Sequence, residues 1–357
     1  MLWWRNPKKR VQREWRRSML RVTEVLGAPE TAKPGVEVSW VKKKFLEIPR
    51  DLVILFVAFL VMCAIFALLK PQFLNGRNIM NVLRQIAVVF ILASGQTFSI
   101  LSAGIDLSQG AICSLVSVVS ADIVIRHGVF WGILAGLGAG TFCGLVTGLF
   151  VGLAGIQPFI ATMGMIFIAS GGALVYTGGI AIFGLDKPQY QGFFFPGGGY
   201  LGPIPMPVVI ATFFMIGVCY LLYRTPFGRH VYAIGGNERS AIMSGIHAGR
   251  TKLFIYVISG FTATVGSLLL TSRILSGQPH LGGFPLLMDS IASVVVGGTS
   301  LMGGEGGIFR TLIGAFIIGF LGNGLNLLGV STFVQQIVIG LIIILSVWAS
   351  ILRSRKA

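Results

Sequence analysis

The chain has 357 residues, of which 54% are hydrophobic and only 11% are charged, and its mean hydropathy is +0.83. A soluble domain carries about 25% charged residues, so this composition excludes an ordinary soluble protein. The apolar runs are continuous rather than alternating, which argues against a β-barrel. The sequence therefore predicts an all-α polytopic membrane protein, whose backbone groups are satisfied within helices.

A spanning helix needs roughly 17–25 mostly apolar residues. About ten stretches meet this requirement, so we expect a transmembrane domain over residues 51–353. In chain order the stretches lie near residues 52–69, 79–101, 107–125, 129–153, 158–177, 205–223, 253–272, 285–302, 308–328 and 331–352.

The basic residues are distributed unevenly along a chain whose formal net charge is +16. If the N-terminus is cytoplasmic and all ten stretches cross the bilayer, 22 of the 28 Lys and Arg residues fall on the inner side. This positive-inside bias predicts that both termini lie in the cytoplasm. The bias also accounts for a pI near 10.3 without nucleic-acid binding, so we expect the lipid bilayer and no nucleic acid as a partner.

Residues 1–50 are predicted to form a basic cytoplasmic segment, because they hold 13 Lys and Arg residues and no apolar run. The same feature predicts no cleavable signal peptide, and the first span is expected to act as a signal anchor. Trp3, Trp4 and Trp15 among the basic residues indicate a segment that lies on the inner leaflet. A disordered basic tail is the alternative, and both interpretations stay open at this point.

Small and polar residues interrupt the apolar sequence at 102–111, SAGIDLSQGA, and again in the second half at 297–307, GGTSLMGGEGG. Interrupted helices at corresponding places in two halves commonly line a substrate path, whereas the alternative is two short turns at the membrane surface. Asp106 is expected to cap a helix rather than bind a substrate. Arg84 and Arg273 are possible counter-ions for the few acidic groups of the membrane domain. The candidate residues of a translocation path are Gln96, Asp106, Ser108, Asp289 and Thr299.

Glycine recurs at every fourth residue from Gly132 to Gly152, within the fourth span. Such a row forms a shallow ridge that lets another helix backbone approach closely. We expect close packing inside the chain rather than a dimer interface. The predicted helix-packing residues are Gly136, Gly140, Gly144 and Gly148.

The longest outer loop, 178–204, is rich in aromatic residues and in Gly and Pro. It is expected to form an ordered extracytoplasmic cap on which a soluble partner can land, or a surface lid that has no partner. The long inner loop, 224–250, is basic and is expected to carry one short amphipathic helix over 237–245, closed by Gly245.

Motifs for catalysis and metal binding were sought and not found. The four cysteines lie within apolar runs, and the four histidines show no ligand spacing. The dipeptide Gly-Lys is absent, so the chain has no Walker A loop for a nucleotide phosphate. We therefore predict that the chain is not an enzyme and holds no metal and no cofactor, and that any ATP is bound by another chain.

Four long motifs, in this order, carry a family resemblance. They are GQTFSILSAGIDLSQGA (95–111), GIQPFIATMGMIFIASGGALVYTGG (155–179), TPFGRHVYAIGGNERSAIMSGI (225–246) and VVVGGTSLMGGEGGIFRTLIGAFIIGFLGNGLNLLGVS (294–331). Through them, residues 52–352 resemble the permease subunit of bacterial ABC importers for ribose and related monosaccharides.

The resemblance implies a plasma-membrane protein of about ten spans that pairs with a second permease subunit. It also implies ATPase subunits that bind ATP and Mg²⁺, and an extracytoplasmic sugar-binding protein. The inner loop resembles the family's ATPase-coupling segment E-A-A-x-x-x-G, although Arg239 replaces the acidic residue and Glu238 precedes it. A nucleoside or polyol importer and a stand-alone secondary carrier are the alternatives. The residues assigned to the coupling loop are Gly235, Gly236, Asn237, Glu238, Arg239, Ser240, Ala241 and Gly245.

Overall fold

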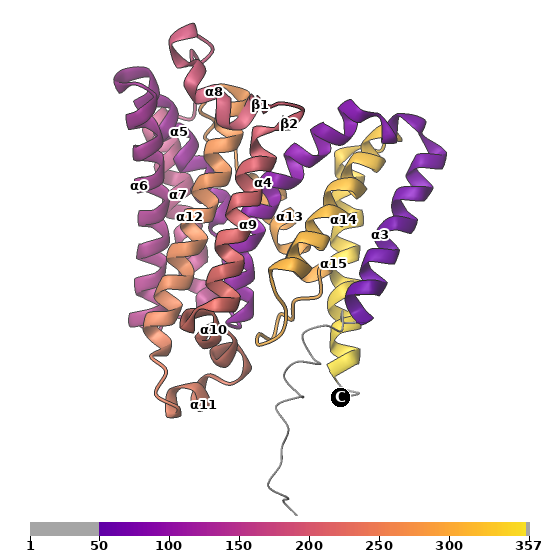
Figure 1. Cartoon of the computed structure of the whole chain (residues 1–357). Coiled ribbons are helices and arrows are strands. Elements are labelled where there is room, and N and C mark those ends of the chain that lie inside the picture. The colour runs from indigo at the N-terminus through magenta and orange to yellow at the C-terminus, as the bar shows by residue number, and fades with distance from the viewer. Residues whose placement is uncertain (1–49, 355–357) are drawn as a thin grey trace, which may run out of the picture. The chain divides into compact units, whose positions relative to one another are not determined.

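The computed structural model describes residues 50–354, and this part of the chain is almost entirely helical (Figure 1). The predictions for the basic N-terminal segment concern residues 1–49 and therefore lie outside the described residues. The long helices are α3 (Arg50–Leu69), α4 (Gly76–Leu101), α5 (Gln109–His127), α6 (Val129–Gly148), α7 (Pro158–Thr177), α9 (Met206–Arg224), α12 (Ala248–Ile274), α13 (Gly283–Val296), α14 (Ile308–Leu327) and α15 (Thr332–Ser354).

Shorter elements complete the described part of the chain. They are the helical turns η1 (Pro71–Leu74) and η3 (Pro188–Tyr190), the π-helical turn η2 (Leu149–Leu153) that continues α6, the helices α8 (Gln191–Gly198), α10 (Pro226–Gly236) and α11 (Glu238–Met243), and the strands β1 (Tyr200–Leu201) and β2 (Ile204–Pro205). The two strands form an antiparallel hairpin. In Figure 1 this hairpin and α8 lie at one end of the bundle, and α10 and α11 lie at the other.

Within residues 50–354, eight helices are long and apolar enough to cross a membrane, and two shorter apolar stretches, α13 and Thr332–Trp348 of α15, accompany them. The all-α polytopic fold is thus confirmed. The ten predicted spans correspond to these eight helices and two shorter ones. The placement of both termini in the cytoplasm stays a prediction.

Prolines mark the starts of several helices. Pro158 and Pro226 occupy the first position of α7 and α10, and Pro207 lies in the first turn of α9. Proline is tolerated there because the first helical N–H groups have no partner within the helix. In α7, α9 and α10 the helix therefore begins at or next to a proline.

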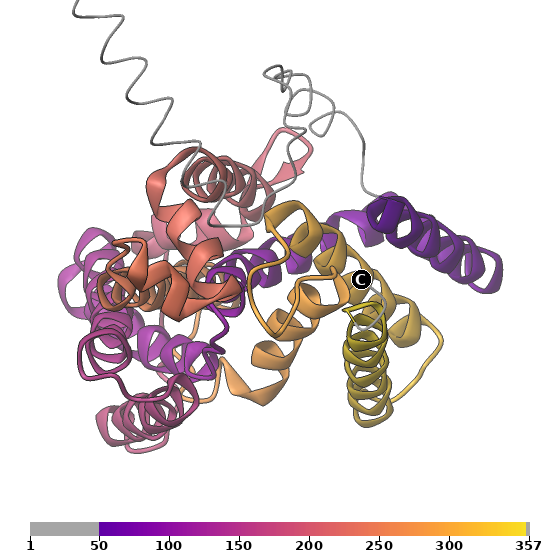
Figure 2. The ribbon, with the colours of Figure 1, turned by 90° about the horizontal axis from the view of Figure 1, so that it is seen from below.

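The centre of the bundle is formed by α4, α5 and α12, the long helices with the most buried residues. Its largest fully buried side chains include Phe90, Phe98, Ile112 and Tyr256. Helix α4 contacts α12 and α9 on one side and α13 and α14 on the other. Figure 2 shows α4 crossing the middle of the bundle, so it joins helices from both halves of the sequence.

The glycine ridge of α6 faces α5 near one end and α12 along the rest of its length. A Cβ atom built on Gly136 would lie 3.0 Å from Leu268 Cδ2, and one on Gly144 would lie 3.0 Å from Gly260 Cα. Gly148 approaches the backbone of Leu253 in the same way. The ridge therefore permits a backbone-to-backbone contact within the chain.

Replacing Gly144 with Leu is expected to destabilise the fold, because the added side chain has to displace the backbone of α12. We expect a loss of at least about 1–3 kcal/mol, the usual cost of overpacking a well-packed core. Gly138→Leu is the matched control, since no atom lies within 4 Å of a Cβ built there. Thermal unfolding of the purified proteins measures the difference, and equal stability of the two variants would contradict the close helix contact.

Candidate functional site

The segment between α4 and α5, residues 102–108, is not helical and runs back along α4. Gln109, the first residue of α5, donates from Nε2 to the Leu92 carbonyl at 3.1 Å. Leu92 lies nine residues before Leu101 on α4, which corresponds to about 14 Å along the helix axis. The first polar interruption thus enters the bundle interior rather than forming a turn at its surface.

Asp106, in the middle of this segment, is 1% exposed and held by two side chains. Gln96 donates from Nε2 to the Asp106 carbonyl at 3.1 Å and accepts from its N–H group at 3.3 Å. Asp106 Oδ1 accepts from the N–H group of Ser108 at 2.8 Å and from the Ser108 hydroxyl. A carboxylate beside the first N–H groups of a helix is stabilised by the helix dipole. The N-cap residue of α5 is Ser108, which makes no side-chain cap bond, so Asp106 stabilises the turn before the helix instead of capping it as expected.

Gln109 connects four helices, although the sequence analysis did not single it out. Its Nε2 also donates to Ser259 Oγ on α12 at 2.9 Å, and its Oε1 accepts from Ser290 Oγ on α13 at 3.1 Å. With the bond to Leu92 on α4, both ends of the buried amide have partners. Its signal in the sequence is weak, because a glutamine beside a polar stretch predicts nothing about distant partners.

A second non-helical segment, residues 275–282, precedes α13 and runs along α5. Gly277 pairs with Ile182 in an antiparallel bridge. Further along, the N–H group of Gln278 donates to Ser117 Oγ at 3.0 Å, and that of Gly282 donates to Ser114 Oγ at 3.2 Å. Side chains of α5 therefore provide hydrogen-bond acceptors for backbone that has none within a helix.

The predicted span at 285–302 is wrong at its end. Helix α13 covers residues 283–296, and 297–307 form a loop. The helix stops there because Gly298 adopts a φ of +88°, which a helix cannot contain. The missing length of this span is supplied by the non-helical residues before α13.

Helices α5 and α13 begin beside each other. A Cβ atom on Gly110 would lie 2.7 Å from the Gly283 carbonyl oxygen, and Gly282 packs against the Gly110 carbonyl. Each half of the chain thus has a long helix, a non-helical segment and a shorter helix, in that order. The matching interruptions are 102–108 and 275–282, whereas the sequence analysis matched 102–111 with 297–307.

The loop at 297–307 is compact and fastened to three other elements. Gly304 N–H donates to the Leu101 carbonyl at the end of α4 at 2.9 Å. The Tyr232 hydroxyl of α10 donates to the Gly306 carbonyl at 3.0 Å, and the Tyr223 hydroxyl of α9 accepts from an N–H group at the start of α14. Burial raises the pKa of Tyr232, which keeps this phenol protonated as a donor. Thr299, 3% exposed, accepts from the Gly307 N–H group inside the loop.

The inner loop predicted at 224–250 contains two helices, not one. Besides α11, helix α10 covers most of the first half, and α12 begins already at Ala248. Thr225 caps α10 and Pro226 follows it, a start signal that the sequence analysis passed over. Helix α10 therefore connects α11 to the membrane helix α9.

Helix α11 starts and ends as predicted. The Asn237 side chain accepts from the Ser240 N–H group at 2.9 Å, and Gly245 closes the turn with a φ of +85°. Ala241 packs inward, whereas Ile242 and Met243 are 51% and 87% exposed. A short helix with two exposed apolar side chains has the features of a docking element.

Gly235 and Gly236, at the end of α10, differ in their surroundings. A Cβ on Gly235 would collide with the Leu101 carbonyl and lie 2.5 Å from the Gly304 N–H nitrogen. One on Gly236 would meet nothing within 4 Å. Because Gly235 has no side chain, the backbone of α10 can contact both the end of α4 and the 297–307 loop at this residue.

A cavity of about 510 Å³ opens beside this junction, and its lining includes Ser102, Asn237, Arg239 and Tyr256. Glu238 and Lys252, which also line it, form an ion pair at 2.6 Å. The cavity therefore lies between α10, α11 and the membrane helices, with both polar and apolar side chains around it.

The predicted path residues thus have different surroundings. Gln96, Asp106, Ser108 and Thr299 are buried and bonded within the chain. Asp289 on α13 is half-buried, and its carboxylate forms no hydrogen bond or ion pair with residues 50–354. A role for any of the five in a solute path stays a prediction.

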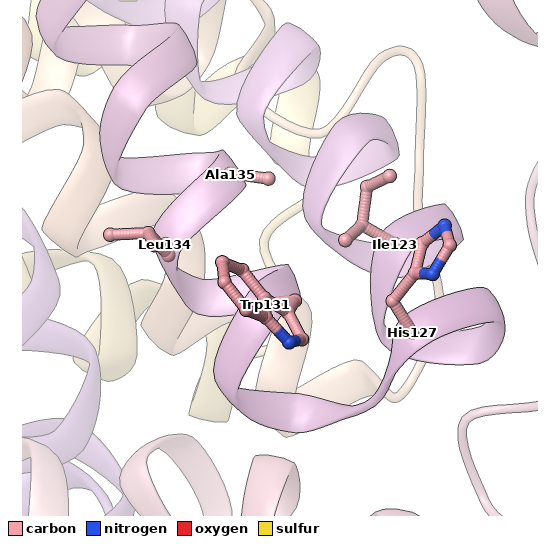
Figure 3. Close-up of a pocket in the computed structure, with 5 residues that line it drawn as sticks. All are labelled: Ile123, His127, Trp131, Leu134 and Ala135. Atoms are coloured by element: carbon pink, nitrogen blue, oxygen red, sulfur yellow. The ribbon is translucent and has the colours of Figure 1, made fainter.

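An apolar groove between α5 and α6 lies apart from these features (Figure 3). It is lined by Ile123, His127, Trp131, Leu134 and Ala135. Trp131 is 56% exposed. An amphipathic ring at the end of a span is typical of the membrane interface, so we assign the groove to lipid contact rather than to the site.

Comparisons with known proteins give a consistent result. The family model described as "Branched-chain amino acid transport system / permease component" matches residues 78–347. The chain is 44% identical to the ribose import permease protein of Bacillus subtilis over 82% of this chain and 90% of that protein. It is 36% identical to the D-allose transport system permease protein of Escherichia coli (80% and 87%), and 32% to the xylose transport system permease protein of that organism (80% and 87%). No solved structure matches the chain significantly.

Replacing Gln109 with Leu is expected to lower the free energy of unfolding by about 1–3 kcal/mol, because buried groups on three other helices lose their partner. Gln157→Leu is the control, since Gln157 is exposed and its side chain does not cap α7. Its stability should change by no more than about 0.5 kcal/mol. Denaturant or thermal unfolding compares the two, and equal effects would contradict the connecting role of Gln109.

Proposed function

Because the chain belongs to the family of permease components of the branched-chain amino acid transport system type, we propose that it translocates a monosaccharide as the membrane subunit of an ATP-driven importer. The chain is a transport subunit and not an enzyme, and it is a multi-pass protein of the inner membrane. The sugar is a pentose or hexose of the ribose type, since the relatives named above are permeases for ribose, allose and xylose.

One observation carries the coupling part of the proposal: Gly235 places the end of α10 against both Leu101 and the 297–307 loop. In this proposal α11 docks on an ATPase subunit through Ile242 and Met243, and the ATPase holds ATP and Mg²⁺. Movement of α11 reaches α10 directly, because only Asn237 separates the two helices. The contact at Gly235 then passes the movement to α4 and α14.

Two further partners belong to this proposal: a second permease subunit and an extracytoplasmic sugar-binding protein. A second permease subunit completes the path, because four of the five candidate path residues are already bonded within one chain. The cap formed by α8 and the β1–β2 hairpin receives an extracytoplasmic sugar-binding protein, with Tyr200 and Leu201 at least half exposed there. ATP binding changes access to the path only if the ATPase pair holds one permease state more tightly than the other.

Purification of the native complex followed by reconstitution in liposomes tests the function. We expect an ATPase and a solute-binding protein to co-purify, and we expect uptake of radiolabelled ribose, allose or xylose that requires ATP and the binding protein. Uptake of a nucleoside or polyol instead would replace the sugar assignment. Recovery of this chain alone, with solute uptake that needs no ATP, would establish a secondary carrier and overturn the proposal.

Gly235→Ala is expected to uncouple the importer, since the added methyl group separates α10 from α4 and the loop. Sugar uptake should fall at least tenfold while the ATPase still co-purifies and hydrolyses ATP. Gly236→Ala is the matched control, because it adds the same group to the next residue in open space. Uptake and ATP hydrolysis are measured together, and a normal ratio in Gly235→Ala would show that the contact does not transmit movement.

A further inference from the structure

Arg84 on α4 is a buried cation that forms no hydrogen bond or ion pair with the described residues. It is 8% exposed, and its Nε and Nη2 atoms are buried without a hydrogen bond to the described residues. The sequence analysis considered Arg84 as a counter-ion for an acidic group. The ion pairs among residues 50–354 are Arg126–Asp122 and Lys252–Glu238, so Arg84 takes part in neither.

A second arginine adds to the same local charge. Arg273, in the last turn of α12, is half-buried, and α12 packs along α4 in this region, since a Cβ atom on Gly266 would contact Leu92 and Val88 of α4. It takes no part in the ion pairs of the described residues either. The two helices α4 and α12 therefore bring two positive charges together near the hairpin end of the bundle.

The nearest compensating group is the Tyr200 ring of β1. The guanidinium carbon of Arg84 lies 4.9 Å from the ring centre, a cation–π distance. This attraction is much weaker than the cost of burying an unpaired guanidinium beside another cation. The balance of charge therefore calls for an anion that the described residues do not supply.

We propose that Arg84 and Arg273 bind a small inorganic anion such as chloride beneath the β1–β2 hairpin. Buried N–H groups of a guanidinium are strong donors to an anion. The small exposed fraction of Arg84 favours a compact ion over a side chain of another protein. The bound ion fastens the hairpin, through Tyr200, to α4 and α12. This inference does not depend on the transported solute.

Thermal unfolding of the purified full-length chain tests the site in sodium chloride and in sodium gluconate at equal ionic strength. Gluconate is the reference because it is too large for so buried a side chain. We expect the wild-type melting temperature to be higher in chloride by roughly 3 °C. Arg84→Met should show no such difference, and in gluconate it should be at least as stable as wild type, because it removes an uncompensated charge.

Arg77→Met, an exposed arginine on the same helix, is the control and should keep the full chloride effect. Broadening of the ³⁵Cl NMR line by the wild-type protein provides a second measurement if Arg84→Met fails to fold. Equal melting temperatures in both salts, with no line broadening, would overturn the proposal. So would stabilisation that appears only when the solute-binding protein is added, since that result would assign the counter-ion to a carboxylate of the partner.

Discussion

The fold depends on one constraint: non-helical backbone inside a membrane bundle needs hydrogen-bond partners from the protein itself. Two such segments, 102–108 and 275–282, run through the bundle, and side chains of neighbouring helices accept or donate to them. Gln96 serves the first, and Ser114 and Ser117 serve the second. Gln109 then joins α4, α5, α12 and α13 at the place where both segments end.

The same arrangement explains why a movement at one end of the bundle can reach its centre. Helix α10 touches the end of α4 through Gly235, and Leu101 at that end is bonded to the 297–307 loop. The extended segment that follows Leu101 leads directly to Asp106 and Gln109. A displacement of α10 therefore acts on a non-helical segment whose backbone is hydrogen-bonded to side chains. Such a segment rearranges at a lower free-energy cost than a continuous helix does.

Much of this architecture is predictable from the sequence, because length and apolar character identify spans without knowledge of their neighbours. Local signals also placed the cap at Asn237 and the closing glycine of α11. The non-helical path of residues 275–282 was not predictable, because their partners on α5 lie more than 150 residues away in the chain. Gln109 was missed for the same reason, and α10 was missed because its basic residues suggested a loop.

The shortness of α13 has a consequence for how the protein is made. Its 14 residues span about 21 Å, less than the roughly 30 Å of a bilayer core, and the residues before it are non-helical. Such a segment is a poor candidate for independent insertion, so its place in the membrane depends on packing against α4 and α14 and on the hydroxyl groups of Ser114 and Ser117, which hold the residues before it. Because α4 and α5 are synthesised before residues 275–282, the first half of the chain can act as an assembly template for the second.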